Sequence, residues 1–316
     1  MPVNCNKTHE WKADIARSVD MYNDWFMCFA PKAFRETRIQ TTKDVEKTLV
    51  ATDNLRNILP AVLKQHPEVL PTLRMSTCPP IAVDRLVGLA GVSKNLVGCM
   101  EEGKIPPRMA AHELDQDLRK IGAIIQKMAD PDIFVWLERG DAPQDSEFHR
   151  AATIVADRLC GAVANPIIRN AQEKRQLAAI AAWLEAHGYK HAADGTRFNG
   201  MEPGTFSFRM NVPVKLESGI QVNIPIDAVI MPKTSSLGTL PIFFEAKSAG
   251  DFTNVNKRRK EEAVKMAQLR STYGNAVQFN LFLCGYFDSG YLGYEAAEGI
   301  DWVWEHRIDD FVGFGL

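Results

Sequence analysis

The sequence lacks the features that mark membrane, secreted and zinc-binding proteins. No stretch approaches about 18 uninterrupted apolar residues, and the N-terminal MPVNCNKTHEWK lacks the apolar core of a signal peptide. The six cysteines are scattered singly, with no CxxC pair and no Cys/His cluster at zinc-ligand spacing. We therefore expect a cytoplasmic protein with reduced thiols and no membrane partner.

Several common enzyme signatures are also absent. The chain contains no GxSxG, no P-loop, no GxGxxG and no HExxH. Its net charge of −2 argues against a protein that holds nucleic acid by bulk positive charge. A local basic cleft within a neutral protein remains compatible with that balance.

Length and patterning predict two parts. The 316 residues, 46% of them hydrophobic, suffice for two globular domains. In the first half, apolar residues recur every three or four positions and prolines punctuate them, which predicts helices at 9–29, 43–63, 81–89 and 112–128. The polar segment RGDAPQDS at 139–146 predicts the border between a helical domain, 1–145, and a second domain, 146–316.

The second half alternates between helix and strand patterns. A helix is expected at 165–187 and ends at Gly188, a residue type that commonly ends helices. Further elements are expected in the order strand, strand, strand, helix, strand, at 206–215, 221–230, 240–247, 255–273 and 277–284. This order predicts an α/β (α+β) fold class for the second domain.

Two of these strands carry acidic residues opposite their apolar faces. In the strand 221–230 a period of two puts Asp227 opposite Val222, Ile224, Ile226 and Ala228. In the next strand Glu245 and Lys247 share one face, two residues apart. Two acids and one lysine can therefore converge, although Pro225 favours an edge or a bulge in the first strand.

Such a group suits phosphodiester hydrolysis. A hard divalent cation must be held by carboxylate oxygens, here those of Asp227 and Glu245, while it polarises the phosphate and lowers the pKa of an attacking water. Lys247 could position or deprotonate the water, or neutralise charge on the phosphate. Alternatively, Glu245 and Lys247 form only an exposed ion pair that contributes little to stability.

The helix before the sheet adds one acidic candidate. Glu173 lies on its core stripe, and an acid that points inward is unusual, so it is a further candidate catalytic residue. The structural alternative is a favourable interaction with the helix dipole or a pair with Arg169. Asn170 and Gln176 border the same face.

A basic segment follows the sheet acids. TNVNKRRK, at 253–260, leads into an amphipathic helix, and it supplies candidate DNA contacts at Asn254, Asn256, Lys257, Arg258 and Lys260. The structural alternative is a solvated helix start whose bases are balanced by Glu261 and Glu262.

Spacing alone does not identify the site. Asp84 with Glu102 and Lys104 repeats the same interval and the same E-x-K pattern, yet Asp84 falls in a helical pattern and Glu102 precedes two prolines. The set of Asp227, Glu245 and Lys247 differs in its context, because its two acids end alternating apolar runs and a basic helix follows.

The residues also resemble a known family. PID at 225–227 with EAK at 245–247 resembles the PD-(D/E)xK nuclease motif, although Ile226 separates a proline and an aspartate that are adjacent in the consensus. The segments EAKSAGDFTNVNKRRKEEA, NPIIRNAQEKRQL and LRMSTCPPIAVDRLVGLAG are similar to the XamI family of type II restriction endonucleases.

This resemblance implies a mixed sheet flanked by helices and Mg²⁺-dependent cleavage of double-stranded DNA at a short palindrome, with GTCGAC as a candidate site and 5′-phosphate ends. It implies that Asp227 and Glu245 are metal ligands, that Lys247 is the catalytic lysine, and that a cognate DNA methyltransferase protects the host. A palindromic target implies a homodimer. The N-terminal helices could then supply dimer contacts or DNA recognition.

Two other functions stay open at this point. One is a repair or recombination nuclease that recognises DNA structure, and the other is a non-catalytic DNA-binding protein that keeps only the architecture. Discrete fragments in a plasmid digest would exclude the former. The intact set of Asp227, Glu245 and Lys247 speaks against the latter.

Overall fold

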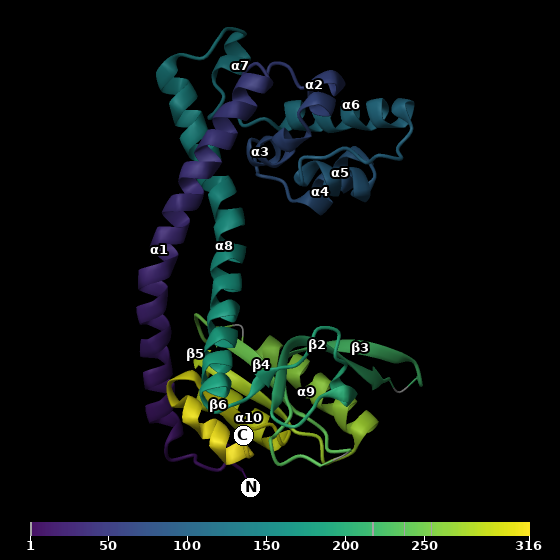
Figure 1. Ribbon diagram of the computed structural model, residues 1–316. Coiled ribbons are helices and arrows are strands. Elements are labelled where there is room, and N and C mark those ends of the chain that lie inside the picture. The colour runs from purple at the N-terminus through teal and green to yellow at the C-terminus, as the bar shows by residue number, and fades with distance from the viewer. Residues whose placement is uncertain (1, 217, 237, 254) are drawn as a thin grey trace. The chain divides into compact units, whose positions relative to one another are not determined.

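The protein was analysed as a computed structural model (Figure 1), which describes residues 2–216, 218–236, 238–253 and 255–316, without the side chains of 255–258. The chain divides into two compact units. We call Met1–Phe29 with Arg169–Leu316 the sheet unit, and Ala30–Ile168 the helical unit.

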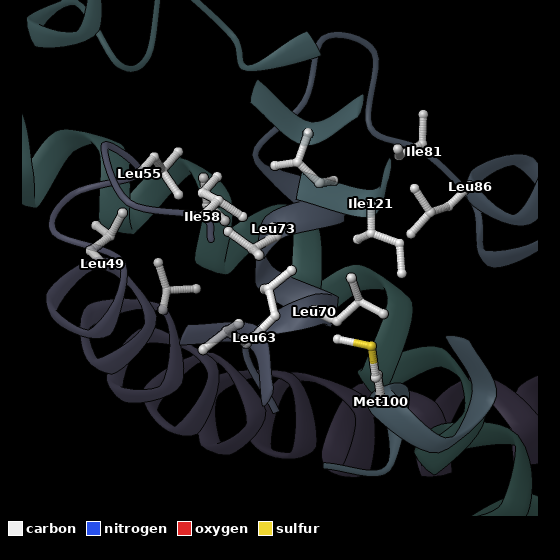
Figure 2. Close-up of a cluster of buried hydrophobic side chains, with 14 of the residues drawn as sticks. Leu49, Leu55, Ile58, Leu63, Leu70, Leu73, Ile81, Leu86, Met100 and Ile121 are labelled. Atoms are coloured by element: carbon white, nitrogen blue, oxygen red, sulfur yellow. The ribbon is translucent and has the colours of Figure 1, made fainter. Parts of the chain in front are cut away.

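The helical unit contains short helices and parts of two long ones. Its elements are the C-terminal part of α1 (Trp11–Ala51), α2 (Pro60–Gln65), η1 (Pro67–Val69), α3 (Leu70–Met75), α4 (Val83–Ala90), α5 (Lys94–Glu101), α6 (Ala111–Met128), α7 (Trp136–Arg139) and the N-terminal part of α8 (Asp145–Ala186). Their apolar faces meet in one cluster, in which Leu49, Leu63, Leu70, Leu73 and Met100 are fully buried (Figure 2). The prediction of a helical N-terminal region is confirmed.

The sheet unit holds one mixed sheet with the strand order β1-β2-β3-β4-β5-β6. Its elements are β1 (Lys190–His191), η2 (Phe198–Gly200), β2 (Thr205–Lys215), β3 (Gln221–Ile230), β4 (Ile242–Ala249), α9 (Val255–Tyr273), β5 (Phe279–Gly285), α10 (Ser289–Ala297), β6 (Trp302–Trp304) and η3 (Glu305–Phe314). β2, β3 and β4 pair antiparallel, whereas β4, β5 and β6 are parallel. This arrangement confirms the predicted mixed sheet flanked by helices.

Helices cover both faces of the sheet. Leu177, Ile180 and Leu184 of α8 pack with Phe282 of β5 in one apolar cluster. Met266 and Leu269 of α9 pack with alternate β5 residues, including Leu281 and Leu283, in another. The predicted elements of this half agree with the structure to within two or three residues, except that α8 begins 20 residues before the expected helix.

The compact units divide the chain at other positions than the predicted border between residues 145 and 146. RGDAPQDS is a turn between α7 and α8 inside the helical unit, since α8 runs without interruption from Asp145 to Ala186. The predicted end of the first helix at residue 29 was wrong, because α1 continues through Pro31 to Ala51. Pro31 and Pro166 both lie within three residues of a border between the units, where each removes one helical hydrogen bond.

One described helix, α8, is long and apolar enough to cross a membrane by length and composition alone. In its most apolar 18-residue segment, 39% is buried inside the protein, and the core helices of other proteins can be equally long and apolar.

Gly122 provides a test of packing in the helical unit. Alanine is usually the better helix former by about 1 kcal/mol. A Cβ at Gly122 would, however, lie 2.4 Å from the carbonyl oxygen of Ile58. We expect Gly122→Ala to lower the free energy of unfolding by about 1–3 kcal/mol in urea denaturation. Unchanged or increased stability would contradict this packing.

Candidate active site

The site lies where β3 and β4 separate. Their last pair, Ala228 with Phe244, is followed by Asp227 on β3 and Glu245 on β4. Beyond this fork β3 pairs only with β2, while β4 continues beside β5. The segment with Pro225 is therefore a sheet edge on its β4 side, where proline is tolerated.

A distortion in β2 lies opposite the fork. Arg209 has a φ of 52°, and the ladder between β2 and β3 omits the pair that Arg209 would form with Asp227. On β3, Ile226 belongs to the cluster under α9, whereas Ala228 belongs to the cluster under α8. The strand therefore twists at Asp227, so that simple alternation no longer describes its two faces.

The predicted trio converges at this fork. Asp227 Oδ2 accepts a hydrogen bond of 2.9 Å from the backbone N–H of Ala246, the residue between Glu245 and Lys247. Lys247 Nζ lies 3.3 Å from Glu245 Oε1. The carboxylate of Asp227 thus replaces the β3 partner that the backbone of β4 has lost.

Helix α9 adds two residues that the sequence did not single out. Glu262 Oε1 lies 3.1 Å from Lys247 Nζ, and Lys265 Nζ lies 2.6 Å from Glu245 Oε1. Lys265 also donates to the carbonyl oxygen of Pro225 at 3.1 Å. Glu262 had been expected to balance bases at a solvated helix start, but it is fully buried.

The helical period of α9 could have revealed both residues. Glu262 precedes the core residue Met266 by four positions, and Lys265 precedes the core residue Leu269 by four. Residues four apart share a helix face. Glu262 and Lys265 therefore continue the apolar stripe of α9 and bring charged groups next to Glu245 and Lys247.

Burial and neighbouring charges shift the pKa values of the residues at this site. Burial, and next the neighbouring charge of Glu245, raise the pKa of Asp227 to about 6. Burial opposes a charged Lys247, but Glu245 and Glu262 outweigh it, so the pKa of the Lys247 ammonium is raised. Burial also raises the pKa of Glu262. With all groups ionised, three carboxylates face two ammonium groups, which leaves one negative charge.

The alternative of an exposed Glu245–Lys247 ion pair is not supported by this geometry. The Glu245 side chain is 7% exposed and that of Lys247 18%. A pair at this depth must offset the loss of hydration, so it differs from surface pairs of little consequence.

The donor set fits a divalent cation. Glu245 Oε2 is buried and lacks a hydrogen-bond partner, and it belongs to the carboxylate that raises the pKa of Asp227. Within the described residues no group of three or more His, Cys, Asp or Glu side chains could hold a metal ion. Mg²⁺ is usually held by one or two carboxylates together with waters and substrate phosphates, rather than by an all-protein cage, and Asp227 and Glu245 supply two carboxylates.

The remaining candidates from α8 fall into different places. Glu173 accepts hydrogen bonds of 3.0 and 2.7 Å from Arg209, not from Arg169. Gln176 is buried and donates to the carbonyl oxygens of Lys247 and Phe282, so it joins α8 to β4 and β5. Asn170 is exposed.

The basic segment is described only in part. Asn254 lies outside the described residues, as do the side chains of Asn256, Lys257 and Arg258. Lys260 is exposed near the start of α9. Arg259 stacks on the ring of Tyr294 in α10 at 3.6 Å.

The described residues also line a large cavity. It has a volume of about 1380 Å³ and lies in the helical unit, between α1, residues 66–72 and Leu159, Val163 and Ile167 of α8. Its lining mixes lysines, acids and apolar groups and offers no cluster of metal ligands.

Comparison with known proteins identifies the family. A model described as XamI restriction endonuclease matches residues 53–304, most of the chain. The chain belongs to the XamI restriction endonuclease family. It is also 56% identical to the type II restriction enzyme SalI of Streptomyces albus G over 315 residues, 99% of either chain.

Membership of the XamI family identifies a site-specific deoxyribonuclease, which decides against a structure-specific repair nuclease and a non-catalytic binding protein. A solved structure, protein VC1899 from Vibrio cholerae, aligns with 87% of this chain and 56% of its own, at 11% identity and a TM-score of 0.28. A likeness this low carries no conclusion about the fold.

The raised pKa of Asp227 predicts a stability that depends on pH. The folded-state pKa of about 6 exceeds the ordinary value of 3.8, so the folded protein binds the proton more tightly than the unfolded chain. The contribution of Asp227 to stability is therefore present at low pH and is lost as the pH rises from about 4 through about 6.

In EDTA, we expect Asp227→Asn to match the wild type near pH 4 and to exceed it by about 1–2 kcal/mol near pH 7.5. Urea denaturation at both pH values measures the difference. A variant that is less stable than the wild type near pH 7.5 would contradict the electrostatic account.

Proposed function

We propose that this chain is a Mg²⁺-dependent type II restriction endonuclease that cuts both strands of a short palindrome and leaves 5′-phosphate ends. The observation that carries the proposal is the meeting of Asp227, Glu245 and Lys247 at the fork between β3 and β4. Membership of the XamI family supports the same reading. The recognition sequence suggested by the family is GTCGAC.

Asp227 and Glu245 are the residues that would hold the cation. When bound, a divalent cation polarises the phosphate and lowers the pKa of the attacking water. Asp227 keeps one oxygen on the backbone N–H of Ala246, which fixes the carboxylate without help from other side chains. Ionisation of Asp227, with a pKa of about 6, is needed before its oxygens can bind a cation.

Lys247 acts in our proposal as a charged group. The sequence left three roles open, and the raised pKa of the Lys247 ammonium disfavours that of a base in the resting protein. A protonated lysine can neutralise charge that develops on the phosphate and can donate a hydrogen bond to it. Glu262 of α9, whose carboxylate lies 3.1 Å from the Lys247 ammonium, keeps it in position.

Lys265 has a different place in the proposal. Its ammonium lies 2.6 Å from Glu245, so it partly neutralises the site in the free protein. A cation held by Glu245 would compete with it, and Lys265 could then turn to a phosphate. Lys260 is a proposed phosphate contact, as are Asn256, Lys257 and Arg258 of the same helix. Asn254, which lies outside the described residues, is a further candidate. Glu173 remains a weaker catalytic candidate, since Arg209 already neutralises it.

A palindromic site has two-fold symmetry, so two subunits that each cut one strand would match it. We therefore propose a homodimer that works in the cytoplasm beside a cognate DNA methyltransferase. Light scattering of the purified protein with and without duplex DNA tests the stoichiometry.

The decisive test is a digest of unmethylated plasmid DNA with Mg²⁺ or with EDTA. We expect discrete Mg²⁺-dependent fragments with ends at GTCGAC that religate without kinase treatment. Asp227→Ala and Lys247→Ala should each reduce cleavage by at least about 1000-fold, because each removes part of the catalytic group. Asp115→Ala, which removes one carboxylate of an exposed pair on α6, serves as the control.

Smeared products, or full activity in Asp227→Ala, would contradict the proposal. A digest with discrete ends at another hexamer would correct the recognition sequence and leave the active site in place.

The role of Glu262 gives a separate prediction. Glu262→Gln removes the charge that holds Lys247, so we expect kcat to fall by about 10-fold to 100-fold while DNA affinity changes little. The alkaline limb of the pH–rate profile should also move to lower pH, because the pKa of Lys247 loses one of its supports.

Glu295→Gln is the matched control. Glu295 is buried on α10, and burial, followed by the charge of Glu262, raises its pKa to about 8. An amide therefore replaces a carboxyl group that is already neutral near pH 7. Equal losses in the two variants, or an unshifted profile in Glu262→Gln, would assign Glu262 to packing alone.

A further inference from the structure

Two consecutive helices of the helical unit are joined by a tight turn. α4 ends at Gly91, which adopts a left-handed conformation with φ 59° and donates its N–H to the carbonyl oxygen of Val87. Only Val92 and Ser93 follow before α5 begins at Lys94. Two helices joined by three residues with glycine at the turn form the helix-turn-helix pattern, whose second helix enters the major groove of DNA.

The buried residues fit this pattern. Leu86 of α4, Val92 of the turn, and Val97 and Met100 of α5 are buried in the apolar cluster of the helical unit, where Figure 2 labels Leu86 and Met100. Ala90, the last residue of α4, is buried as well. The two helices thus share one core, which fixes their crossing.

A partly buried ion pair anchors both helices to α3. Arg74 donates hydrogen bonds of 2.7 and 2.6 Å to the carboxylate of Glu101, the last residue of α5. The same guanidinium donates to the carbonyl oxygen of Ile81 at 2.6 Å, just before α4. This anchor holds α5 as a rigid element, as a reading helix must be held.

The outward face of α5 carries polar groups near its start. Ser93, Lys94, Asn95 and Gly98 are exposed, while Leu96 and Val97 are buried. Gly98 follows Lys94 by four residues and Asn95 by three, so it shares a helix face with each of them. Lysine pairs with guanine and asparagine with adenine in the major groove.

Gly98 is unexplained by the fold itself. Glycine inside a helix lowers stability relative to alanine, because it loses more conformational freedom on folding. It is therefore usually found where a side chain would not fit. A Cβ at Gly98 would meet nothing within 4 Å, as at Gly88 of α4, and the backbone there does not require glycine. Gly98 differs from Gly88 in that it lies beside Lys94 and Asn95 on α5. A bare backbone in the middle of an exposed face suits close approach by an external surface.

The charges on this face favour contacts with DNA bases over general binding to the phosphate backbone. Lys94 pairs with Asp84 at 3.1 Å, but both side chains are 77% exposed, so the pair is weak and Lys94 can leave it. Lys104 is likewise balanced by Glu102. A nearly neutral face adds little general affinity for phosphate, whereas base contacts specify sequence.

We propose that α4 and α5 form a helix-turn-helix element that reads the recognition sequence, with Lys94 and Asn95 contacting bases in the major groove and Gly98 allowing the approach. The proposal rests on the proposed function, sequence-specific cleavage, and assigns its specificity to the helical unit.

The test measures binding and stability together. The wild type and the variants Gly98→Ala, Lys94→Ala and Asn95→Ala are titrated, in EDTA and at one fixed salt concentration, against a labelled short duplex with the hexamer mapped from the digest and against its scrambled counterpart. Thermal unfolding of the same proteins is recorded. Gly88→Ala is the control, because Gly88 is exposed on α4, has nothing within 4 Å of a Cβ and lies off the α5 face.

We expect Gly98→Ala and Gly88→Ala to raise the unfolding midpoint alike, by roughly 2–4 °C. Gly98→Ala alone should weaken binding to the mapped site by about tenfold or more, without changing affinity for the scrambled duplex. Lys94→Ala and Asn95→Ala should each lower discrimination between the two duplexes by about 10-fold to 100-fold.

Two outcomes would overturn the inference, and they can be told apart. If the wild type discriminates between the duplexes and all three α5 variants do so equally well, α5 does not read the sequence and the proposed function stands. If the wild type binds and cuts both duplexes alike, the proposed function fails and the inference fails with it.

Discussion

The separation of β3 from β4 is the constraint on which the candidate active site depends. While the strands pair, their backbones satisfy each other and leave no place for a ligand. Where they part, the N–H of Ala246 loses its partner and Asp227 supplies a carboxylate in its place. The fork therefore produces both a buried acid and the open edge beside it. Glu245 and Lys247 reach the same point because β4 continues straight beside β5.

Helix α9 controls the charge at this fork. Without it, Glu245 would face Asp227 with only Lys247 to balance the two acids. Lys265 covers Glu245 in the free protein, and Glu262 holds Lys247 from the side away from the sheet. The result is a site that is close to neutral but that retains an unpaired carboxylate oxygen, Glu245 Oε2. In our proposal, a divalent cation held by Glu245 would take the place of the Lys265 ammonium.

The sequence predicted what depends on periodicity and missed what depends on tertiary context. A period of two placed Glu245 and Lys247 on one face of their strand and Asp227 on the neighbouring strand. It did not predict the twist at Asp227, where simple alternation fails. The burial of Glu262 was not predicted, because an acidic residue beside several basic ones is typical of a solvated helix start. Its contact with Lys247 of β4 depends on the tertiary structure. The continuation of α1 through Pro31 was not predicted, because proline commonly ends a helix, whereas here the helix continues with the loss of one hydrogen bond. The turn at Gly91 was not recognised as a motif, because only the helix before it was predicted.

The most direct test of the account is the position of a bound cation. Crystals of the protein soaked in Mn²⁺, a Mg²⁺ substitute with a strong anomalous signal, would show where the ion binds. We expect an anomalous peak held by both Asp227 and Glu245, with the Lys265 ammonium moved away from Glu245, and no peak in Asp227→Ala crystals. A peak elsewhere in the molecule, or one that persists in the variant, would contradict the assignment of this fork as the metal site.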